Sequence, residues 1–571
     1  MNSVVPLDAM RHINGLLQGG DFRAAQDQLQ AIVAAHPEYG EARRLLGGAK
    51  LALGDVAGAE RALREAAAME PVWPPTLTML GELLLSRGRC EEGEPFLLRA
   101  ATGTPADPHA ALVLARFYND RQHPEQALVV VEPYCARGHV APELATQHVR
   151  ALVALGRNAD AVAFYRDDLE GSPDDIAAVH ALAMALQASN RHAEAARIAQ
   201  RAIDRGHKSA ALQHTRARSL VATGEFERAE AALRDCLQLE PQRVEAHNDL
   251  ARLVWMRTGN SAQATAMLDR AIARFGNNDA LWAAKAAVLQ GSGDARAAYA
   301  CLAARVDRPQ PPPALLIRAG LAALEFDPST ALSLAERALR VQPSDSSARK
   351  LLVAAQLGVG DVRGALELCD ALRAEEPDDQ YLIALQTTAW RMLGDERYAR
   401  FCDYRKRVVP YRLEAPSPWS NLNDFLADLK QSLGKLHDAL RHPLLFQSLR
   451  HGTETTEDLA RSQDPVVQAL FKAFDAPIRD YMSRIGHGAD PLQRRNHGAY
   501  RFNGSWSVRL RASGFHHNHV HPRGWISSAC YIELPDRVAD ARSREGVLTF
   551  AEPGILTTPV LHDEHEVQPQ E

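Results

Sequence analysis

Four histidines lie close together near the end of the chain and carry the clearest chemical signal in the sequence. The stretch GFHHNHVHPRGW contains His516, His517, His519 and His521, and eight of the 22 histidines fall in the last 85 residues. Imidazole suits several transition metals, so the cluster predicts a metal site. A solvated histidine-rich loop, or chance capture of zinc by an exposed cluster, remains the alternative interpretation.

The spacing of the histidines limits which of them can share one ion. On an extended segment alternate residues point the same way, so His517, His519 and His521 would share a face. Neighbours in this set are about 6.6 Å apart along the backbone, which two imidazoles can close around one ion. The outer two are about 13 Å apart, which is too far for all three to bind together on a straight strand. Pro522 follows His521 directly and favours the pair His519 and His521, with a third ligand from elsewhere.

Two segments beside the cluster have the period-two pattern of β-strands. In SWSVRL, Trp506, Val508 and Leu510 alternate with polar residues, and WISSACYI over 525–532 alternates in the same way. We therefore expect β-structure beyond about residue 498, with the histidines presented between two strands.

The region between about 408 and 498 is expected to be mainly helical. Residues 422–440 and 465–484 have the spacing of amphipathic helices. Before them, VVPYRLEAPSPWSNLNDF contains three prolines and marks a linker or an entering strand. The segment SLRHGTETT is expected to form a turn that orders this helical part. Its Arg450, Thr453, Thr455 and Thr456 are expected to cap or order structure, with no catalytic role.

The first 400 residues repeat with a period of 34. A small residue recurs in eleven steps from one end of this region to the other, with a mean spacing of 34 residues. These positions are Ala25, Ala59, Gly93, Ala127, Ala161, Ala195, Ala229, Ala264, Ala298, Ala331, Ala365 and Ala399. Small side chains at a fixed register let two helices cross closely, whereas a larger one would force them apart.

Each repeat also carries its own signals for a turn and for a helix end. A Gly or Asn, such as Gly224 or Asn190, precedes most of the small positions by five residues and predicts a left-handed turn. Prolines in one common phase, such as Pro37 and Pro241, predict the end of the second helix.

Composition excludes several classes of protein. The 571 residues carry a formal net charge of −6, so no basic footprint for nucleic acid or anionic lipid exists. No window approaches 18 consecutive apolar residues, and the first residues lack a secretory signal, so we expect no membrane span. The seven cysteines are scattered and never form a CxxC pair, which favours a reducing cytoplasm over a disulfide scaffold.

The 34-residue period resembles that of tetratricopeptide repeats. The resemblance covers residues 1–408 and implies about 11–12 helix pairs stacked into an α-solenoid. Solenoids expose a long concave groove, so we expect a peptide or protein to bind there. The alternative is an array that only spaces and supports the other domain. No asparagine recurs at a fixed register, so the chemistry of the groove ligand is not predicted.

The second region, residues 409–571, resembles a family of Fe(II)- and 2-oxoglutarate-dependent oxygenases. The similarity lies in three stretches, HPLLFQSLRHGTETT (442–456), SWSVRL (505–510) and GFHHNHVHPRGWISSACYIELP (514–535). It implies a double-stranded β-helix, Fe(II) as cofactor and 2-oxoglutarate as cosubstrate. The expected fold class is therefore mainly α, a tetratricopeptide α-solenoid followed by a truncated α+β double-stranded β-helix domain.

The resemblance also assigns residues. The HxD/E metal pair of such enzymes falls on His519 and His521, so a histidine stands at the usual carboxylate position. Tyr531 matches the place where some prolyl hydroxylases hold the distal carboxylate of 2-oxoglutarate, and Arg509 is a weaker candidate for the same oxoacid. A satisfied core tyrosine and a solvated strand arginine are the alternatives.

The family continues with a strand that bears a distal histidine and then an arginine for the oxoacid. Here the sequence runs only to HDEHEVQPQE, so we expect an incomplete barrel if Glu571 is the natural end. His562 and His565 are substitutes for the distal ligand, but their acidic, proline-bounded segment is typical of a loop.

The leading hypothesis is therefore an oxygenase that hydroxylates a peptide or protein substrate recruited by the repeats. The alternative is a non-catalytic tetratricopeptide scaffold or adaptor with a degenerate or truncated oxygenase domain. A glycosyltransferase is disfavoured because no Gly-rich phosphate loop follows residue 408. The substrate and the oligomeric state are not determined by the sequence.

Overall fold

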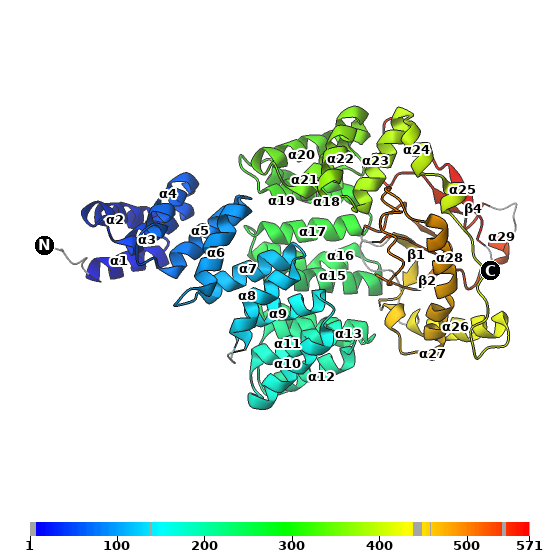
Figure 1. The fold of residues 1–571 in the computed structure, drawn as a ribbon, viewed down its shortest axis with the longest axis horizontal. Coiled ribbons are helices and arrows are strands. Elements are labelled where there is room, and N and C mark those ends of the chain that lie inside the picture. The colour runs from blue at the N-terminus through cyan, green and yellow to red at the C-terminus, as the bar shows by residue number, and fades with distance from the viewer. Residues whose placement is uncertain are drawn as a thin grey trace. The chain divides into compact units, whose positions relative to one another are not determined.

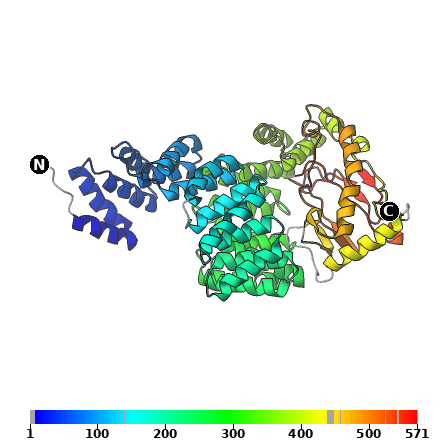
Figure 2. The same cartoon turned by 60° about the horizontal axis from the view of Figure 1, so that its bottom comes forward.

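The computed structural model describes residues 7–136, 140–437, 448–456, 458–522, 524–539 and 544–569. The chain forms two compact units, residues 1–216 and 217–571. In both units helix–turn–helix pairs follow one another, and Figures 1 and 2 show the pairs of each unit stacked side by side. The predicted class, mainly α with a repeat solenoid first, is confirmed, and the described residues of the C-terminal region add only a few short strands.

The helices of the first unit form consecutive pairs. They are α1 (Leu7–Gln18), α2 (Phe22–Ala35), α3 (Gly40–Ala52), α4 (Val56–Ala67), α5 (Pro74–Ser86), α6 (Cys90–Thr102), α7 (Pro108–Asp120), α8 (Pro124–Cys135), α9 (Pro142–Ala154), α10 (Asn158–Gly171), α11 (Ile176–Ala188) and α12 (His192–Asp204).

The division between the units falls inside α13 (Ala210–Ala222), and the pairs then continue. They are completed by α14 (Phe226–Leu239), α15 (Val244–Thr258), α16 (Ser261–Arg274), α17 (Asp279–Gly291), α18 (Ala295–Val306), α19 (Pro313–Ala323), α20 (Pro328–Val341), α21 (Ser346–Val359), α22 (Val362–Glu375), α23 (Gln380–Leu393) and α24 (Glu396–Phe401).

The predicted turns and helix ends are where the sequence signals placed them. Gly224 has φ +76° and Asn190 has φ +57°, the left-handed conformation that closes the turn within each pair. Helix α2 ends at Ala35, two residues before Pro37, and α14 ends at Leu239, two residues before Pro241. Local chain chemistry therefore sets the repeat boundaries.

The small residues of the 34-residue register lie at close helix crossings. Ala25, Ala195 and Ala229 are fully buried. At Gly93 a Cβ would lie 2.9 Å from the carbonyl oxygen of Gly81, so not even alanine fits without a shift. The register ends at Ala399, which is exposed because α24 is a helix of only six residues.

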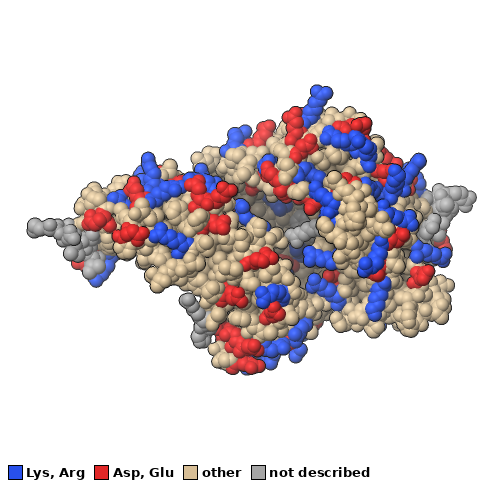
Figure 3. All heavy atoms as spheres, in the orientation of Figure 1, with Lys and Arg blue, Asp and Glu red and all other residues tan. Residues whose placement is uncertain are grey.

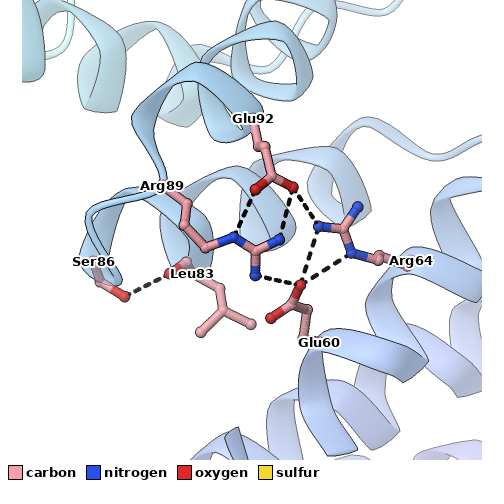
Figure 4. Close-up of polar contacts among 6 residues, drawn as sticks. All are labelled: Glu60, Arg64, Leu83, Ser86, Arg89 and Glu92. Carbon is pink, nitrogen blue, oxygen red and sulfur yellow. Dashed lines mark hydrogen bonds and ion pairs between the residues drawn. The ribbon is translucent and has the colours of Figure 1, made fainter. Parts of the chain in front are cut away.

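Charged side chains link neighbouring pairs on the surface. On the face shown in Figure 3, Lys and Arg are interspersed with Asp and Glu. Figure 4 shows one such network, in which Glu60 and Arg64 of α4 meet Arg89 and Glu92 beside α6. Arg89 donates to both oxygens of Glu92 at 2.7 Å and to Glu60 at 2.7 Å, and Arg64 donates to Glu92 at 2.9 Å. Hydrogen bonds from Arg89 and Arg64 lower the pKa of Glu92 to about 2.

Two further findings concern the whole described chain. None of its helices combines the length and apolar character needed to cross a lipid bilayer. All seven cysteines are free thiols.

The C-terminal region combines helices with two small antiparallel sheets. Its elements are α25 (Tyr404–Arg407), α26 (Leu422–His437), β1 (Leu449–Glu454), the 3₁₀ helix η1 (Leu459–Arg461), α27 (Pro465–Ala473), α28 (Asp475–Ile485), β2 (Val508–His516), α29 (Asp536–Ala539), β3 (Leu548–Phe550) and β4 (His565–Val567). Strand β1 pairs with β2, and β3 pairs with β4. The expected helices over 422–440 and 465–484 are present, with 438–440 outside the described residues, and the domain boundary near 408 stays a prediction.

Two local expectations for this region are wrong. The segment SLRHGTETT is not a turn, because it contains strand β1, and 525–532 is irregular although its residues alternate. The described residues therefore contain two separate two-stranded sheets rather than the double-stranded β-helix that the resemblance implies. Alternation alone does not make a strand, since a strand also needs a partner for its backbone groups. The first stretch of the family resemblance, 442–456, is only partly described, because residues 442–447 lie outside the described residues.

The helices of this region pack on a core of their own. Phe425, Leu429 and Leu433 of α26 are buried against Val467 and Leu470 of α27. Ile532 packs against the same cluster, which ties the irregular chain after the histidines to the helical layer.

The last described segment rests on the final repeats. Thr558 donates through its backbone N to Leu357 O at 3.2 Å and through Oγ1 to Gly358 O at 2.7 Å. Arg391 of α23 pairs with Glu564 at 2.6 Å, and Tyr398 of α24 donates to the same carboxylate at 2.5 Å. Within the second unit, hydrogen bonds and an ion pair therefore join the last repeats to the C-terminal region.

The crossing at Ala229 of α14 supplies a direct test of the repeat packing. The variant Ala229→Leu should lower the free energy of unfolding by about 1–3 kcal/mol, because added carbons cannot be accommodated at a fully packed crossing. Ala231→Leu, at an exposed position of the same helix, should change it by less than about 0.5 kcal/mol. Chemical denaturation followed by circular dichroism measures both. Equal effects of the two variants would contradict the proposed crossing.

Candidate metal site

The pairing of β1 with β2 positions the histidine cluster. The register places Leu449 opposite His516 and Glu454 opposite Val508, with a bulge between Arg450 and Gly452. One further backbone bond, from His517 N to Ser448 O at 2.9 Å, extends the pairing past the end of β2. The first two histidines of the cluster are therefore fixed against β1, and the chain turns away after them.

His519 and His521 lie side by side, as the spacing suggested. Their ring centroids are 5.0 Å apart and the rings are nearly perpendicular, at 77°. His519 Nδ1 is 2.7 Å from the carbonyl oxygen of His517, so Nδ1 donates its proton, and Nε2, 3.5 Å from the hydroxyl of Ser448, is the nitrogen that carries the lone pair. The ring of His521 packs against Trp506 at 5.5 Å.

The other two histidines of the cluster point to different neighbours. His516 stacks on His519 with centroids 6.0 Å apart, and His516 Nδ1 is 2.9 Å from the hydroxyl of Ser448. His517 instead packs on Phe515 at 5.0 Å. The expectation that His517 shares a face with His519 and His521 is wrong, because β2 ends at His516 and the chain does not stay extended beyond it.

His516, His517 and His519 are exposed to solvent, and His521 is half-buried. Packing around the rings lowers the pKa of both His516 and His521, and the nearby His519 lowers both further. In the described part of the chain, however, no three His, Cys, Asp or Glu side chains already surround a common point in a way that could hold a metal ion. The structure thus brings two predicted ligands together without completing a site around them.

Arg509 and Tyr531, predicted to bind the oxoacid, occupy different surroundings. Arg509 lies on β2 opposite Thr453, and its Nη2 donates to the carbonyl oxygen of Gly434 in α26 at 3.1 Å. Tyr531 is half-buried in the irregular segment, where burial raises its pKa.

Of the two substitutes considered for a distal ligand, His565 has ring contacts outside the cluster. His565 belongs to strand β4 rather than to a loop, and its ring stacks on Tyr404 at 5.8 Å with an interplanar angle of 9°. It also packs on Phe550 at 5.9 Å. His562 lies in irregular chain, and Glu571 is outside the described residues.

A buried polar network behind β1 escaped the sequence analysis. His437, at the end of α26, is buried with Nδ1 2.8 Å from Thr453 Oγ1 and Nε2 3.0 Å from Ser507 Oγ. Ser507 N in turn donates to Thr455 Oγ1 at 3.0 Å. These residues lock the helix to both strands. The sequence signal for this network was a polar residue, His437, at the end of the apolar stripe of its helix.

Glu454 of β1 is also buried, and its side chain makes no hydrogen bond within the described chain. Desolvation raises the pKa of this carboxyl to about 7. The neutral acid is therefore the form that the folded strand favours.

Family models match both parts of the chain. Tetratricopeptide repeat models match residues 10–72 and residues 220–288 and 322–388. A model described as "Putative 2OG-Fe(II) oxygenase" matches residues 504–570, which include the histidine cluster. The chain therefore carries tetratricopeptide repeats followed by a domain of this 2OG-Fe(II) oxygenase family, as the resemblance implied. None of the curated proteins matches it.

Several solved structures are similar to the chain at low TM-scores. Yeast Tom70 is 13% identical, with 70% of this chain and 97% of that chain covered and a TM-score of 0.36. The APC/C hetero-tetramer Cut9–Hcn1 is 14% identical over 66% and 82%, with a TM-score of 0.29. A tetratricopeptide repeat protein from Parabacteroides merdae is 14% identical over 56% and 98%, with a TM-score of 0.26. Scores this low carry no argument about function.

The buried Glu454 predicts a specific dependence of stability on pH. Its pKa is about 7 in the folded chain against an ordinary 4.5, so the folded state binds more protons between these values. The wild type should therefore lose stability as pH rises from 4.5 to about 7, a loss that Glu454→Gln removes. At pH 8 the free energy of unfolding of Glu454→Gln is expected to exceed that of the wild type by on the order of 2 kcal/mol.

Thermal unfolding at pH 5 and pH 8 measures the difference in stability between Glu454→Gln and the wild type. Glu552→Gln, at an exposed position, is the matched control. A gap between Glu454→Gln and the wild type that is the same at both pH values would contradict the buried-acid assignment.

Proposed function

We propose that the protein is an Fe(II)- and 2-oxoglutarate-dependent oxygenase that hydroxylates a peptide or protein substrate recruited by the repeat array. In this proposal His519 and His521 bind the metal, and Tyr531 and Arg509 are the candidates for binding 2-oxoglutarate. The observation that carries it is the close pair of imidazoles within the family-matched segment.

The geometry of the pair suits one shared ion. A ring centroid lies about 3 Å from a metal bound to the same ring at about 2.1 Å. Two such rings 5.0 Å apart enclose the ion at an angle near that of adjacent octahedral or tetrahedral ligands. The bond from His519 Nδ1 to the carbonyl oxygen of His517 orients the ring and leaves Nε2 as the atom that could bind a metal, a common arrangement for ligating histidines. Imidazole donors fit Fe(II), although they fit zinc and copper as well.

When bound, Fe(II) with 2-oxoglutarate would supply the oxidising power to hydroxylate an unactivated carbon. The chain itself would hold the ligands, orient the cosubstrate and present the target. Tyr531 is the better candidate for a carboxylate of 2-oxoglutarate, because its hydroxyl has no partner in the described chain. Arg509 already uses one N–H on Gly434 and would have to offer another.

A substrate held by the repeats would reach the histidines through the second unit. His517 lies within electrostatic range of Arg450 on β1 and of Glu325, which follows α19. Glu325 accepts a hydrogen bond from Gln290 of α17 at 2.7 Å. In this proposal a peptide lying along these repeats would pass within electrostatic range of His517.

A non-catalytic scaffold is the second candidate. It is favoured by the lack of a preformed three-residue metal group in the described residues and by the partial β-structure around the histidines. In that case the repeats would bind a partner, and the C-terminal region would serve as a rigid end.

The double variant His519→Ala/His521→Ala separates the two functions. Iron-dependent turnover of 2-oxoglutarate should fall by at least about 100-fold, because each lost ligand removes several kcal/mol of metal binding. Succinate release in the presence of Fe(II) and ascorbate measures it, and circular dichroism should show an unchanged helical array.

The exposed His487→Ala is the matched control, since it removes an imidazole outside the cluster. Turnover that survives in the double variant, or that is absent from the wild type with Fe(II) supplied, would defeat the enzymatic proposal and leave the scaffold.

A further inference from the structure

We propose that strand β2 binds an extended peptide in which acidic and apolar residues alternate. The peptide would add to the outer edge of the strand, along residues 508–512, which we call the β2 edge. The inference rests on the proposed function only in identifying this peptide as the part of the substrate that approaches the histidines.

The β2 edge is open in the part of the chain that the structure describes. There β2 forms a sheet with β1 alone, which pairs with one side of it. Most residues of the strand are exposed to solvent, and 47% of Leu510 is accessible. An edge strand turns alternate backbone N–H and C=O groups away from its partner, and these groups can pair with a further strand. The β2 edge therefore offers a backbone template to an extended peptide.

Positive charge is concentrated around this strand. Between Asp490 and Glu533 the sequence contains no acidic residue, although the whole chain carries a net charge of −6. The same stretch contains six arginines, which are Arg494, Arg495, Arg501, Arg509, Arg511 and Arg523. Arg494 forms an ion pair with Asp378 of the repeats. Charge complementarity therefore favours an acidic peptide at the β2 edge.

The positions of the arginines on the strand define a pattern for the peptide. Arg509 and Arg511 are two residues apart and project to one face, whereas Val508 and Leu510 project to the other. Arg509 already donates to Gly434 O, but Arg511 is exposed and forms no ion pair within the described chain. Opposite charges and apolar pairs facing each other across two strands are favourable. An added strand should therefore place acidic residues opposite the arginines and apolar residues opposite Val508 and Leu510.

An exposed aromatic side chain connects the β2 edge to the histidine cluster. Trp506 precedes the strand by two residues and is 43% exposed. Its ring lies 5.5 Å from that of His521. The chain here still runs along β1, because Thr455 N donates to Ser507 O at 3.0 Å. Exposed tryptophan and arginine are the residue types that contribute most to binding at interfaces. A peptide that extends past Trp506 would therefore reach the candidate metal ligands.

Charge also argues against two other occupants of the β2 edge. A second copy of the chain would bring the arginines of two β2 strands close together, and like charges facing each other across strands are destabilising. A nucleic acid would be repelled at long range by the net charge of −6, and it has no backbone that completes a β-ladder. Both features favour a peptide.

Binding of labelled synthetic peptides to the full-length protein, without metal or 2-oxoglutarate, tests the inference. The probe is the fluorescent peptide Gly-Ser-Glu-Val-Glu-Val-Glu-Gly-Ser, followed by anisotropy at low ionic strength. One matched peptide has Lys in place of each Glu, and another has Pro in place of each Val, which keeps the charge but removes two backbone donors. The Glu–Val peptide should bind at least about tenfold more tightly than either.

A charge reversal on the strand tests the assignment to β2. Arg511→Glu should weaken binding of the Glu–Val peptide by at least about fivefold and should strengthen binding of the Lys peptide, because the cross-strand pair changes sign. Arg511→Lys keeps the charge and should bind the Glu–Val peptide nearly as the wild type does. Arg400→Ala, which removes an exposed arginine of α24, is the matched control and should leave binding unchanged.

The outcomes separate this inference from the proposed function. Absence of binding, equal binding of the proline peptide, or an Arg511→Glu variant that binds like the wild type would overturn the β2 edge and leave the oxygenase standing. Tighter binding of a labelled oligouridylate than of the Glu–Val peptide would overturn it in favour of a nucleic acid. If the Glu–Val peptide binds as expected but the wild type consumes no 2-oxoglutarate, the β2 edge stands and the oxygenase is overturned.

Discussion

The pairing of β1 with β2 is the constraint on which the candidate site depends. It places Ser448 against His516, extends to His517 through one backbone bond, and ends where the chain turns to bring His519 back over His516. The same pairing places Thr453 within hydrogen-bond distance of the buried imidazole of His437. Histidines on an unpaired segment would sample many orientations, and this short ladder removes most of that freedom.

The repeats impose a second constraint, which applies at every crossing of two helices. A small residue at each crossing, such as Ala195, lets successive helices pack closely, and the stability of the array is then roughly a sum over neighbouring pairs. Surface networks such as the one around Arg89 add little each, because their groups are partly solvated. The array is therefore held mainly by burial, and its last pairs gain bonds from the C-terminal segment through Arg391.

The cluster is a group of imidazoles at the surface, in which His516, His517 and His519 are exposed and His521 is half-buried. Desolvation lowers the pKa of His516 and of His521, and His519 Nδ1 donates to the carbonyl oxygen of His517. The family match over 504–570 makes iron the natural candidate, and the imidazole donors agree with it without excluding other metals. The buried network of His437 and the neutral Glu454 give the adjoining strand a rigid, poorly hydrated backing.

By itself the sequence determined the repeat register, the turn and helix ends, and the pairing of His519 with His521, because each depends on residues close together in the chain. It misjudged 525–532 and the strand Leu449–Glu454, because whether a segment is a strand depends on a distant partner. Only the tertiary structure decided that His516 lies beside His519 whereas His517 packs on Phe515, and that His437 is buried. Both outcomes follow from β-pairing across some 60 residues, a long-range contact that no local pattern encodes.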